Sequence, residues 1–232
     1  MRKSLKLILL LSPSSYKLNL YFWINYFHEN KEEELYELTS LISRNGNAID
    51  IGCNKGLYSY ALSKQKKISK IYSFEPNKII TKALCDYKSK KIKIYNYALS
   101  NNNKKKKLII PFYKNYELDG WATLENNIYL KPAFKKFKKI TINTKKLDIF
   151  NFKKVSFVKI DVEGHELKLL NGAKKFFRSN KPDCLIEAKK ENLLKVKKFF
   201  KNLNVEYKYI PKRKFSFKFS KENHLFSVHK NS

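Results

Sequence analysis

The fold is decided by one short stretch, Ala48-Ile49-Asp50-Ile51-Gly52-Cys53-Asn54-Lys55-Gly56. An apolar run reaches an acidic residue, Asp50, and two glycines four positions apart follow, Gly52 and Gly56. Because glycine has no Cβ, it adopts a positive φ and lets a ligand approach the backbone closely. The pattern therefore predicts a buried strand, a tight turn and a helix whose N-terminus faces a ligand. Asp50 would lie at the carboxyl end of the strand, where open α/β sheets bind their ligands.

Two kinds of ligand compete for such a turn. A dinucleotide-binding turn has the pattern G-x-G-x-x-G, which places a pyrophosphate on the helix N-terminus. Here the pattern is D-x-G-x-x-x-G, with an acid before the first glycine. A carboxylate at this place would repel a phosphate and suit a cationic amine. S-adenosylmethionine, which carries an ammonium and a sulfonium group, is therefore favoured, with Asp50, Gly52, Asn54 and Gly56 as contacts.

The composition is that of a globular protein with a high positive charge. The chain has 232 residues, of which 43% are hydrophobic, so one domain with a sizeable core is expected. A formal charge of +30 first suggests nucleic acid as a partner. However, only four of the 50 basic residues are arginines, and arginine is preferred for phosphate and base recognition. A solvated lysine surface is favoured, although its charge would attract an anionic glycan, lipid or membrane.

The cysteines and the N-terminus bear on the cellular compartment. Cys53, Cys85 and Cys184 are scattered without metal-ligand spacing, so we expect buried, unpaired thiols in a reducing cytoplasm. The apolar run at residues 7–11 is too short for a signal peptide or a transmembrane helix. Residues 1–31 form an aromatic-rich extension, and residues 32–232 form the main domain. We expect a helix in the extension that packs on the domain or a partner subunit, with peripheral contact to the inner face of a membrane as the alternative.

Apolar strands and amphipathic helices alternate along most of the chain. This alternation is typical of βαβ units and a parallel sheet, whose right-handed connections put the strand ends on one edge. We expect helices over residues 32–43, 56–65, 77–88, 167–179 and 191–203, and strands over residues 68–74, 92–98, 155–160, 183–188, 205–210 and 224–229.

Residues 107–150 interrupt the alternation. Strands are expected at residues 108–113 and 140–144, and the only stretch with a helical pattern lies around residues 131–137. A long insertion near the ligand edge is expected to cover the substrate. Trp121 within it is either a platform for a sugar ring or a residue of the core or an interface.

Three acidic residues end predicted strands along one edge of the sheet: Asp50, Glu75 and Asp161. For S-adenosylmethionine, Asp50 would lie near the methionine ammonium, and Glu75, followed by Asn77, would accept both ribose hydroxyls. Ala98 and Leu99, after the third strand, would flank the adenine. Each acid could instead cap the following helix, but three acids in phase with the glycines favour a binding site.

The segments that carry these residues resemble the FkbM family of methyltransferases; they are residues 49–56, 74–77, 96–100, 158–166, 169–173 and 185–187. The resemblance spans residues 32–190, and D-V-E-G-H-E at residues 161–166 is its most specific part. It implies a class I methyltransferase: a Rossmann-like, doubly wound, mostly parallel sheet in three α/β/α layers with an antiparallel last strand. It also implies S-adenosylmethionine-dependent O-methylation (EC 2.1.1.-) of sugars, glycolipids or polyketide-type metabolites. Cys53 and Lys55 depart from the family pattern without removing a needed group.

The reaction requires a group that takes the hydroxyl proton. His165 is one candidate for this base, because its ordinary pKa lies near neutrality, and a histidine bonded to the backbone is the alternative. Asp161 is a second candidate, which could equally orient the sulfonium or the acceptor. Glu163 and Glu166 fit the first turn of a helix. Asp161, Glu163 and His165 could also bind a divalent ion, but no further ligand pair accompanies them, and we expect no metal.

The sequence therefore predicts a cytoplasmic O-methyltransferase that modifies a sugar hydroxyl in a surface glycan or its lipid-linked precursor. A basic RNA methyltransferase or nucleic-acid-binding protein on the same scaffold is the second hypothesis, and only the charge supports it. The acceptor itself and the oligomeric state are left open, because many acceptors share one scaffold.

Overall fold

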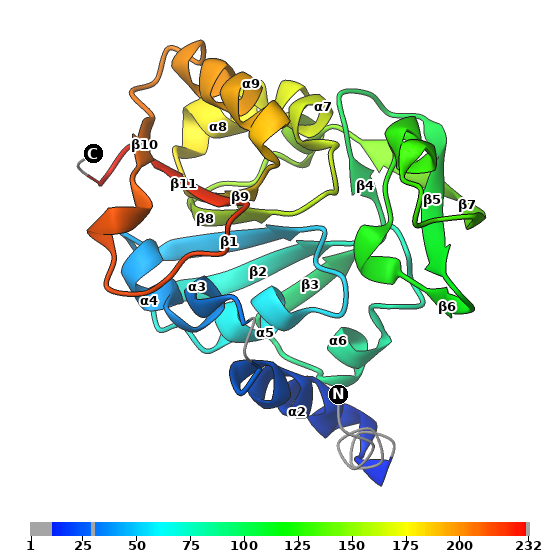
Figure 1. Ribbon diagram of the computed structural model, residues 1–232. Helices are drawn as coiled ribbons and strands as arrows, with labels where there is room; N and C mark the ends of the chain where they lie inside the picture. Colours follow the sequence, from blue (N-terminus) through cyan, green and yellow to red (C-terminus); the bar gives the residue numbers. More distant parts are fainter. Residues whose placement is uncertain (1–10, 29–30, 231–232) are drawn as a thin grey trace.

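A seven-stranded sheet forms the centre of the protein in the computed structural model, which describes residues 11–28 and 31–230 (Figure 1). The strand order is β10-β11-β9-β8-β1-β2-β3. β3, β2, β1, β8 and β9 are parallel, β11 is antiparallel to β9, and β10 is antiparallel to β11. The predicted mostly parallel sheet with an antiparallel last strand is confirmed. The strands are β1 (Gly46–Ile51), β2 (Ile68–Phe74), β3 (Ile92–Tyr95), β8 (Val155–Ile160), β9 (Asp183–Glu187), β10 (Lys208–Ile210) and β11 (Asn223–Ser227).

Helices cover both faces of this sheet, which gives the predicted three layers (Figure 1). One face carries α3 (Glu33–Tyr36), α4 (Leu38–Leu41), α5 (Leu57–Ser63) and α6 (Lys82–Asp86). The other carries α7 (Glu166–Asn171), α8 (Lys174–Asn180) and α9 (Lys190–Lys201). A short 3₁₀ turn, η4 (Lys212–Lys214), lies between β10 and β11.

The alternation of side chains along the central strands divides the core in two. Ile49 of β1 packs in the cluster that contains Leu169 and Phe177 of the second helical layer. Ala48 of β1 packs in the cluster that contains Leu38 and Leu62 of the first. Asp50 and Lys159, which are register partners on β1 and β8, therefore project into the layer of α3 and α5.

Two expected helices are broken for local steric or conformational reasons. The helix expected at residues 32–43 separates into α3 and α4 at Glu37, whose φ is −106°. The helix expected at residues 167–179 separates into α7 and α8 at Gly172. A Cβ at this glycine would lie 2.0 Å from the carbonyl oxygen of Ser100, so the chain there must lack a side chain.

A third expected helix, at residues 77–88, is reduced to α6. The side-chain oxygen of Asn77 accepts the backbone N–H of Ile79 at 3.2 Å, and this local turn replaces the first helical turn. Cys85 on α6 is exposed, whereas Cys53 and Cys184 are buried as expected, and all three are unpaired.

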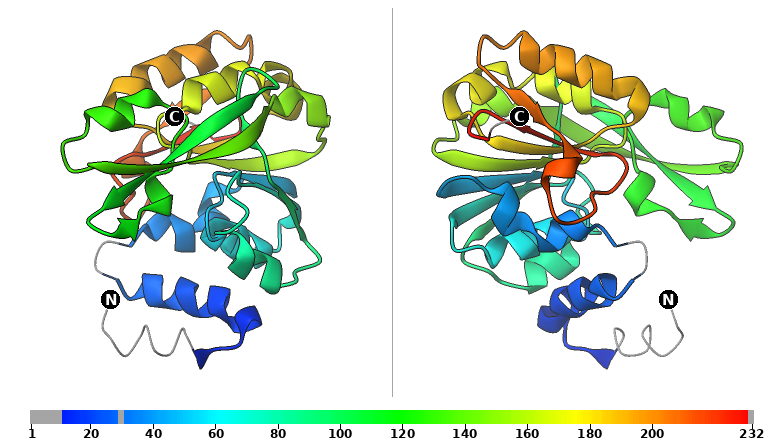
Figure 2. Two further views of the ribbon diagram at one scale, coloured as in Figure 1. Left: turned by 90° about the vertical axis from the view of Figure 1, so that its right-hand side faces the viewer. Right: turned by 60° about the vertical axis from the view of Figure 1, so that its left-hand side comes forward.

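The insertion, together with the short strand β4 that precedes it, forms a second, four-stranded sheet beside the strand ends of the first (Figure 2). Its order is β4-β7-β5-β6, from β4 (Ala98–Leu99), β5 (Lys105–Tyr113), β6 (Tyr116–Glu117) and β7 (Lys136–Lys145). The strand expected at residues 92–98 is thus divided, because β3 pairs in one sheet and β4 in the other. The helix suggested at residues 131–137 is wrong, since β7 begins at Lys136. The 3₁₀ turns are η1 (Asp119–Trp121), η2 (Asn126–Leu130) and η3 (Leu147–Phe150).

The described residues of the N-terminal extension include the helix α2 (Ser14–Tyr26), which packs on α5 and α6. Leu18 is fully buried in this contact, and the ring of Phe22 lies 4.8 Å from that of Tyr36 and 5.2 Å from that of Tyr60. Residues 1–10 and 29–30 of the predicted extension lie outside the described part of the chain. No helix among the described residues is long and apolar enough to cross a membrane.

Candidate functional site

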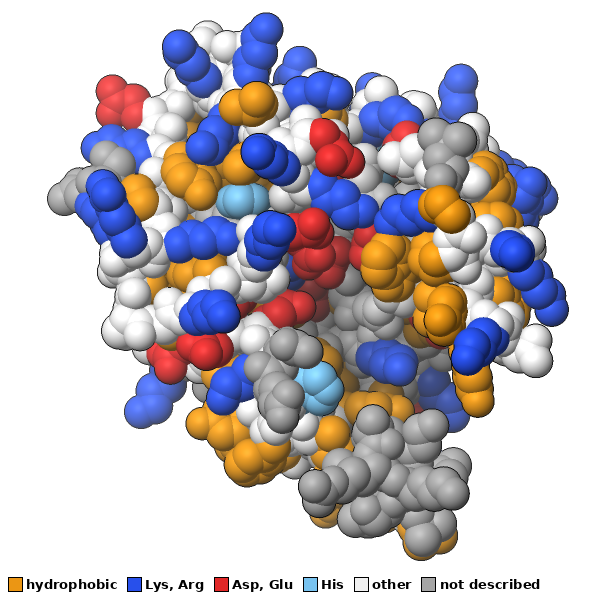
Figure 3. Space-filling model, viewed as in Figure 1, with side chains coloured by type: hydrophobic (Ala, Val, Ile, Leu, Met, Phe, Trp, Pro, Cys, Tyr) orange, Lys and Arg blue, Asp and Glu red, His pale blue; other side chains and the backbone are white. Residues whose placement is uncertain are grey.

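Two adjoining pockets lie where the central strands end, beneath the insertion. The empty space of the inner pocket, counted together with the open solvent at its mouth, is about 600 Å³, and that of the outer pocket is about 1060 Å³. Figure 3 shows acidic side chains gathered in the hollow at the centre of this face. Both pockets are lined by the same five residues where they meet: Gly52, Asn54, Asp119, Gly120 and Asp161.

The turn after β1 requires glycine at position 52. Its φ is +79°, and a Cβ there would lie only 1.7 Å from the carbonyl oxygen of Asp161. The N–H groups of Gly52 and Cys53 both donate to the carbonyl of Phe74, at 2.9 and 3.1 Å. These contacts hold the ends of β1, β2 and β8 together, and with them the three predicted acids.

Asp50 lines the outer pocket and is almost completely buried. Its side chain is 1% exposed, and the hydroxyl of Ser59 donates to its carboxylate at 2.6 Å. Burial raises the pKa of Asp50 to about 6, because the charged form loses its hydration. A cation in the outer pocket would offset this cost.

Glu75 lines the inner pocket at the end of β2. Its carboxylate accepts the N–H of Asn77 at 2.9 Å and that of Asn54 at 3.2 Å. Burial nevertheless raises its pKa to about 7. Asn77 lies behind this carboxylate and lines neither pocket.

The other residues that were predicted to contact S-adenosylmethionine divide into two groups. Ala98 and Leu99 of β4 line the inner pocket together with Tyr97, which makes one wall apolar. Gly56 does not line either pocket. It begins α5 with a φ of +91°, and a Cβ there would collide with Leu84 of α6 at 2.7 Å. Glycine is therefore required at this position by the packing of α5 against α6 and not by contact with a ligand.

Asp161 ends β8 and lines both pockets. Burial raises the pKa of its carboxyl well above the usual range, with Glu187 and Glu163 adding to the rise and Lys159 opposing it. No hydrogen bond to its carboxylate is found within residues 11–28 and 31–230. The position therefore combines access to both pockets with a carboxylate able to take up a proton.

His165 has both ring nitrogens engaged by the protein. Nδ1 lies 2.5 Å from a carboxylate oxygen of Glu125, and Nε2 lies 2.9 Å from the hydroxyl of Ser100. The residue is 3% exposed, and burial lowers its pKa, so the neutral ring is favoured. Glu125 also accepts from Lys168 at 2.8 Å. His165 thus ties the insertion and the end of β4 to the turn after β8, although it still lines the inner pocket.

Lys159 is a functional candidate that the sequence reasoning missed. It is 1% exposed in the middle layer, where Nζ donates to Asn223 at 2.8 Å and lies 3.6 Å from a carboxylate oxygen of Glu187. It also lines the outer pocket, next to Asp50 in the register. A lone lysine in the otherwise uncharged strand at residues 155–160 was the available signal, since buried lysines are rare unless they are paired.

The set of side chains that could bind a metal ion differs from the set Asp161, Glu163 and His165 that the sequence suggested. Among the described residues, oxygen atoms of Asp161, Glu163 and Glu187 lie within 4.8 Å of one another. His165 is turned to Glu125 and Ser100 instead. Lys159 supplies a positive charge beside Glu187, and the absence of a metal stays a prediction.

The residues fit the two ends of S-adenosylmethionine. The apolar wall of the inner pocket suits a purine, and Glu75 beside it has the acceptors that ribose hydroxyls need. The outer pocket holds buried carboxylates for an ammonium and a sulfonium, and one buried ammonium, on Lys159, for a carboxylate. This match of charges is the main chemical feature of the site.

A sheet of this strand order, with a glycine turn and acids at successive strand ends, defines a class I methyltransferase. The family description "Methyltransferase FkbM domain" matches residues 50–213, and the chain belongs to this family. The family is one of methyltransferases, EC 2.1.1.-, and it implies S-adenosylmethionine as the methyl donor.

A solved structure agrees on the fold. The crystal structure of methyltransferase FkbM from Methylobacillus flagellatus KT matches with a TM-score of 0.57 and 17% identity, over 97% of this chain and 58% of that one. The present chain thus spans a little over half of that protein. Precorrin-6y C5,15-methyltransferase from Geobacter metallireducens GS-15 gives a TM-score of 0.47 and 10% identity, over 84% and 86% of the two chains. No curated protein matches the sequence.

Replacing Asp50 by asparagine should flatten the dependence of stability on pH. Because burial raises the pKa of Asp50 to about 6, the folded protein holds this proton more tightly than the unfolded chain. The resulting stabilisation is present in full below about pH 4 and is lost as the pH rises through about 6. Urea unfolding of the ligand-free protein at pH 5 and pH 7.5, values chosen on either side of that pKa, should show a smaller fall in the free energy of unfolding for Asp50→Asn than for the native protein, by about 1.4 kcal/mol. An equal fall in both proteins would contradict the raised pKa of Asp50.

Proposed function

We propose that the protein is an S-adenosylmethionine-dependent O-methyltransferase that acts on a sugar hydroxyl of a surface glycan or glycolipid. The observation that supports S-adenosylmethionine as the methyl donor is the charge pattern of the outer pocket. Asp50, Asp161 and Lys159 lie there, at the ends of neighbouring strands. The three free cysteines are consistent with a cytoplasmic location.

The chain's own groups would hold the donor along its length. Glu75 would accept the ribose hydroxyls, and Ala98 and Leu99 would pack on the adenine. Asp50 would attract the ammonium, while Lys159 would pair with the carboxylate. The donor supplies an activated methyl group when it is bound. Most of the rate would then come from holding the acceptor hydroxyl in line with this methyl group.

Asp161 is the base that the geometry favours. It borders both pockets, its carboxylate is free of hydrogen bonds among the described residues, and burial raises its pKa. A carboxylate with a raised pKa accepts a hydroxyl proton more readily, and such a base contributes about 10²–10⁴-fold. His165, with both nitrogens occupied, would act by holding Glu125 and the turn in place.

The mouth of the site supports a sugar acceptor more than RNA. Trp121 is 41% exposed at the outer pocket, and Nζ of Lys131 and of Lys189 lie 3.9 and 5.7 Å from the centre of its ring. An exposed indole beside polar groups suits the apolar face of a sugar ring. The carboxylates Glu163 and Glu187 nearby would repel an RNA backbone.

Removing the carboxylate of Glu75 should weaken binding of S-adenosylhomocysteine. Hydrogen bonds to a charged acceptor contribute about 1.5–3 kcal/mol each, so Glu75→Ala should raise the Kd by at least about tenfold. The control is Glu206→Ala, which removes an exposed carboxylate far along the chain. Calorimetry with both variants and the native protein tests this. If the native protein binds no S-adenosylhomocysteine, S-adenosylmethionine is not its methyl donor and the proposal is wrong.

The acceptor class can be tested by transfer of a labelled methyl group. Native protein and Asp161→Asn would each be incubated with methyl-labelled S-adenosylmethionine and lipid-linked oligosaccharides, free glycans or total RNA. We expect label in a base-stable sugar ether with the native protein, and a loss of about 10² or more in rate with Asp161→Asn, which should still bind S-adenosylhomocysteine. Label in RNA alone would overturn the sugar acceptor, and full activity of Asp161→Asn would overturn its role as base.

A further inference from the structure

We propose that α2 binds the surface of an anionic membrane and so places the mouth of the site beside the lipid headgroups. The helix lies outside α5 and α6, as the outermost described helix on this side in Figures 1 and 2. Of its 13 residues only Lys17 is charged, although 30% of the whole chain is charged. A helix that faces only water would carry charges on its outer face.

One side of α2 is used for packing and the opposite side is aromatic. Leu18 is fully buried against the domain. Tyr16, Leu20, Trp23 and Phe27 follow one another at helical spacing on the opposite side, and we call them the aromatic stripe. Tyr16 is 67% exposed, Trp23 48% and Phe27 80%. Figure 3 shows hydrophobic side chains on the surface of this part of the molecule.

The residue types in the aromatic stripe match the interface of a lipid bilayer. Tryptophan and tyrosine are enriched at the level of the headgroups, where the ring is buried and its polar group stays hydrated. A helix of this length is about 20 Å long, which is too short to cross the hydrocarbon core and sufficient to lie in the interface. The aromatic stripe would therefore enter the headgroup region with the helix axis in the membrane plane.

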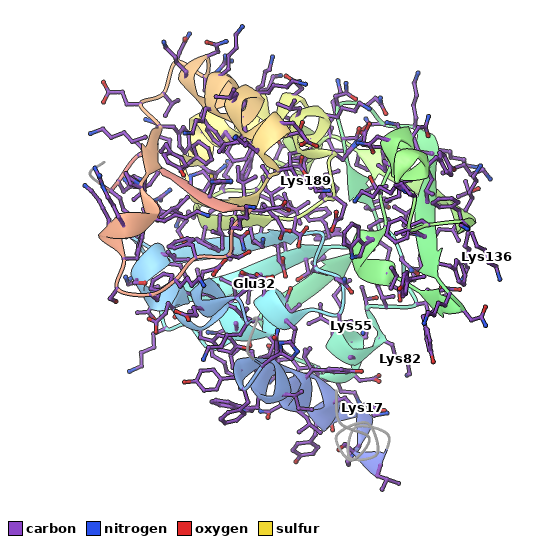
Figure 4. The ribbon with its side chains drawn as sticks, viewed as in Figure 1. Lys17, Glu32, Lys55, Lys82, Lys136 and Lys189 are labelled. Atoms are coloured by element: carbon purple, nitrogen blue, oxygen red, sulfur yellow. The ribbon has the colours of Figure 1, made fainter. Side chains whose placement is uncertain are left out.

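Lysines lie around α2 and favour an anionic surface. Lys17, Lys55 and Lys82 lie in the same part of the molecule as α2 (Figure 4). Nζ of Lys55 lies 5.4 Å from the ring centre of Tyr21, and Nζ of Lys31 lies 4.3 Å from that of Tyr26. Each lysine near an anionic leaflet adds to the electrostatic attraction between protein and membrane.

The charge also argues against a second copy of the chain as the occupant. Two molecules of formal charge +30 would repel each other across a face bordered by lysines, whereas anionic lipids would be attracted. The end of α2 is continuous with the site, because Asn25 and Lys55 line the outer pocket. A membrane-bound molecule would thus present this pocket close to acceptors that are carried on lipids.

Vesicle binding tests the proposal without any substrate. Full-length protein would be floated with vesicles of phosphatidylcholine alone or of phosphatidylcholine and phosphatidylglycerol in equal amounts, at about 0.15 M salt. We expect binding to the anionic vesicles, and at least tenfold weaker binding for the triple variant Tyr16→Ser, Trp23→Ser and Phe27→Ser. In Trp121→Phe, Trp23 is the one remaining tryptophan, and its emission should shift to the blue on binding.

A matched control separates the aromatic stripe from aromatic exposure in general. Tyr113→Ser with Tyr116→Ser removes rings that are 50% and 71% exposed on β5 and β6, and should bind vesicles as the native protein does. Native protein that stays off anionic vesicles, or a triple variant that binds them equally well, would overturn the proposal. A native dimer in light scattering that the triple variant abolishes would assign the stripe to a second copy. Because binding of S-adenosylhomocysteine is measured separately, none of these outcomes bears on the methyltransferase.

Discussion

The close approach of two backbone turns, at Gly52 and at Asp161, is the constraint on which the rest of the site depends. A Cβ at position 52 would lie 1.7 Å from the Asp161 carbonyl oxygen, so β1 and β8 can end side by side only with glycine there. This approach brings Asp50, Lys159 and Asp161 to one pocket. The backbone bonds from Gly52 and Cys53 to Phe74 then bring in Glu75 at the end of β2.

The charges gathered there are poorly compensated by the protein itself. Burial raises the pKa of Asp50, Glu75 and Asp161, which means that the ligand-free site destabilises their charged forms. Lys159 is the buried cation of the outer pocket, and Asn223 and Glu187 hold its ammonium in place. A ligand with a net positive charge would compensate the negative charge of these carboxylates. The site therefore favours a sulfonium-containing methyl donor over a nucleotide phosphate.

Local patterns were enough to predict the central strands but not the contacts between distant segments. The strands at residues 68–74 and 155–160 were predicted with their observed bounds, since apolar runs end at turn residues there. The break at Gly172 was not, because its cause is the carbonyl of Ser100, some seventy positions away by numbering. His165 likewise looked available as a base, and its partners are Glu125 of the insertion and Ser100, which directly follows β4. Gly56 and Asn77 matched the pattern of a binding turn, yet they support the pocket from behind.

A crystal structure of the complex with S-adenosylhomocysteine would show whether the two pockets hold the methyl donor in this way. We expect adenine against Ala98 and Leu99, both ribose hydroxyls on the carboxylate of Glu75, and the amino-acid end in the outer pocket with its carboxylate on Lys159. A nucleoside bound away from Glu75, or an amino-acid end that leaves Asp50 and Lys159 without contact, would contradict it.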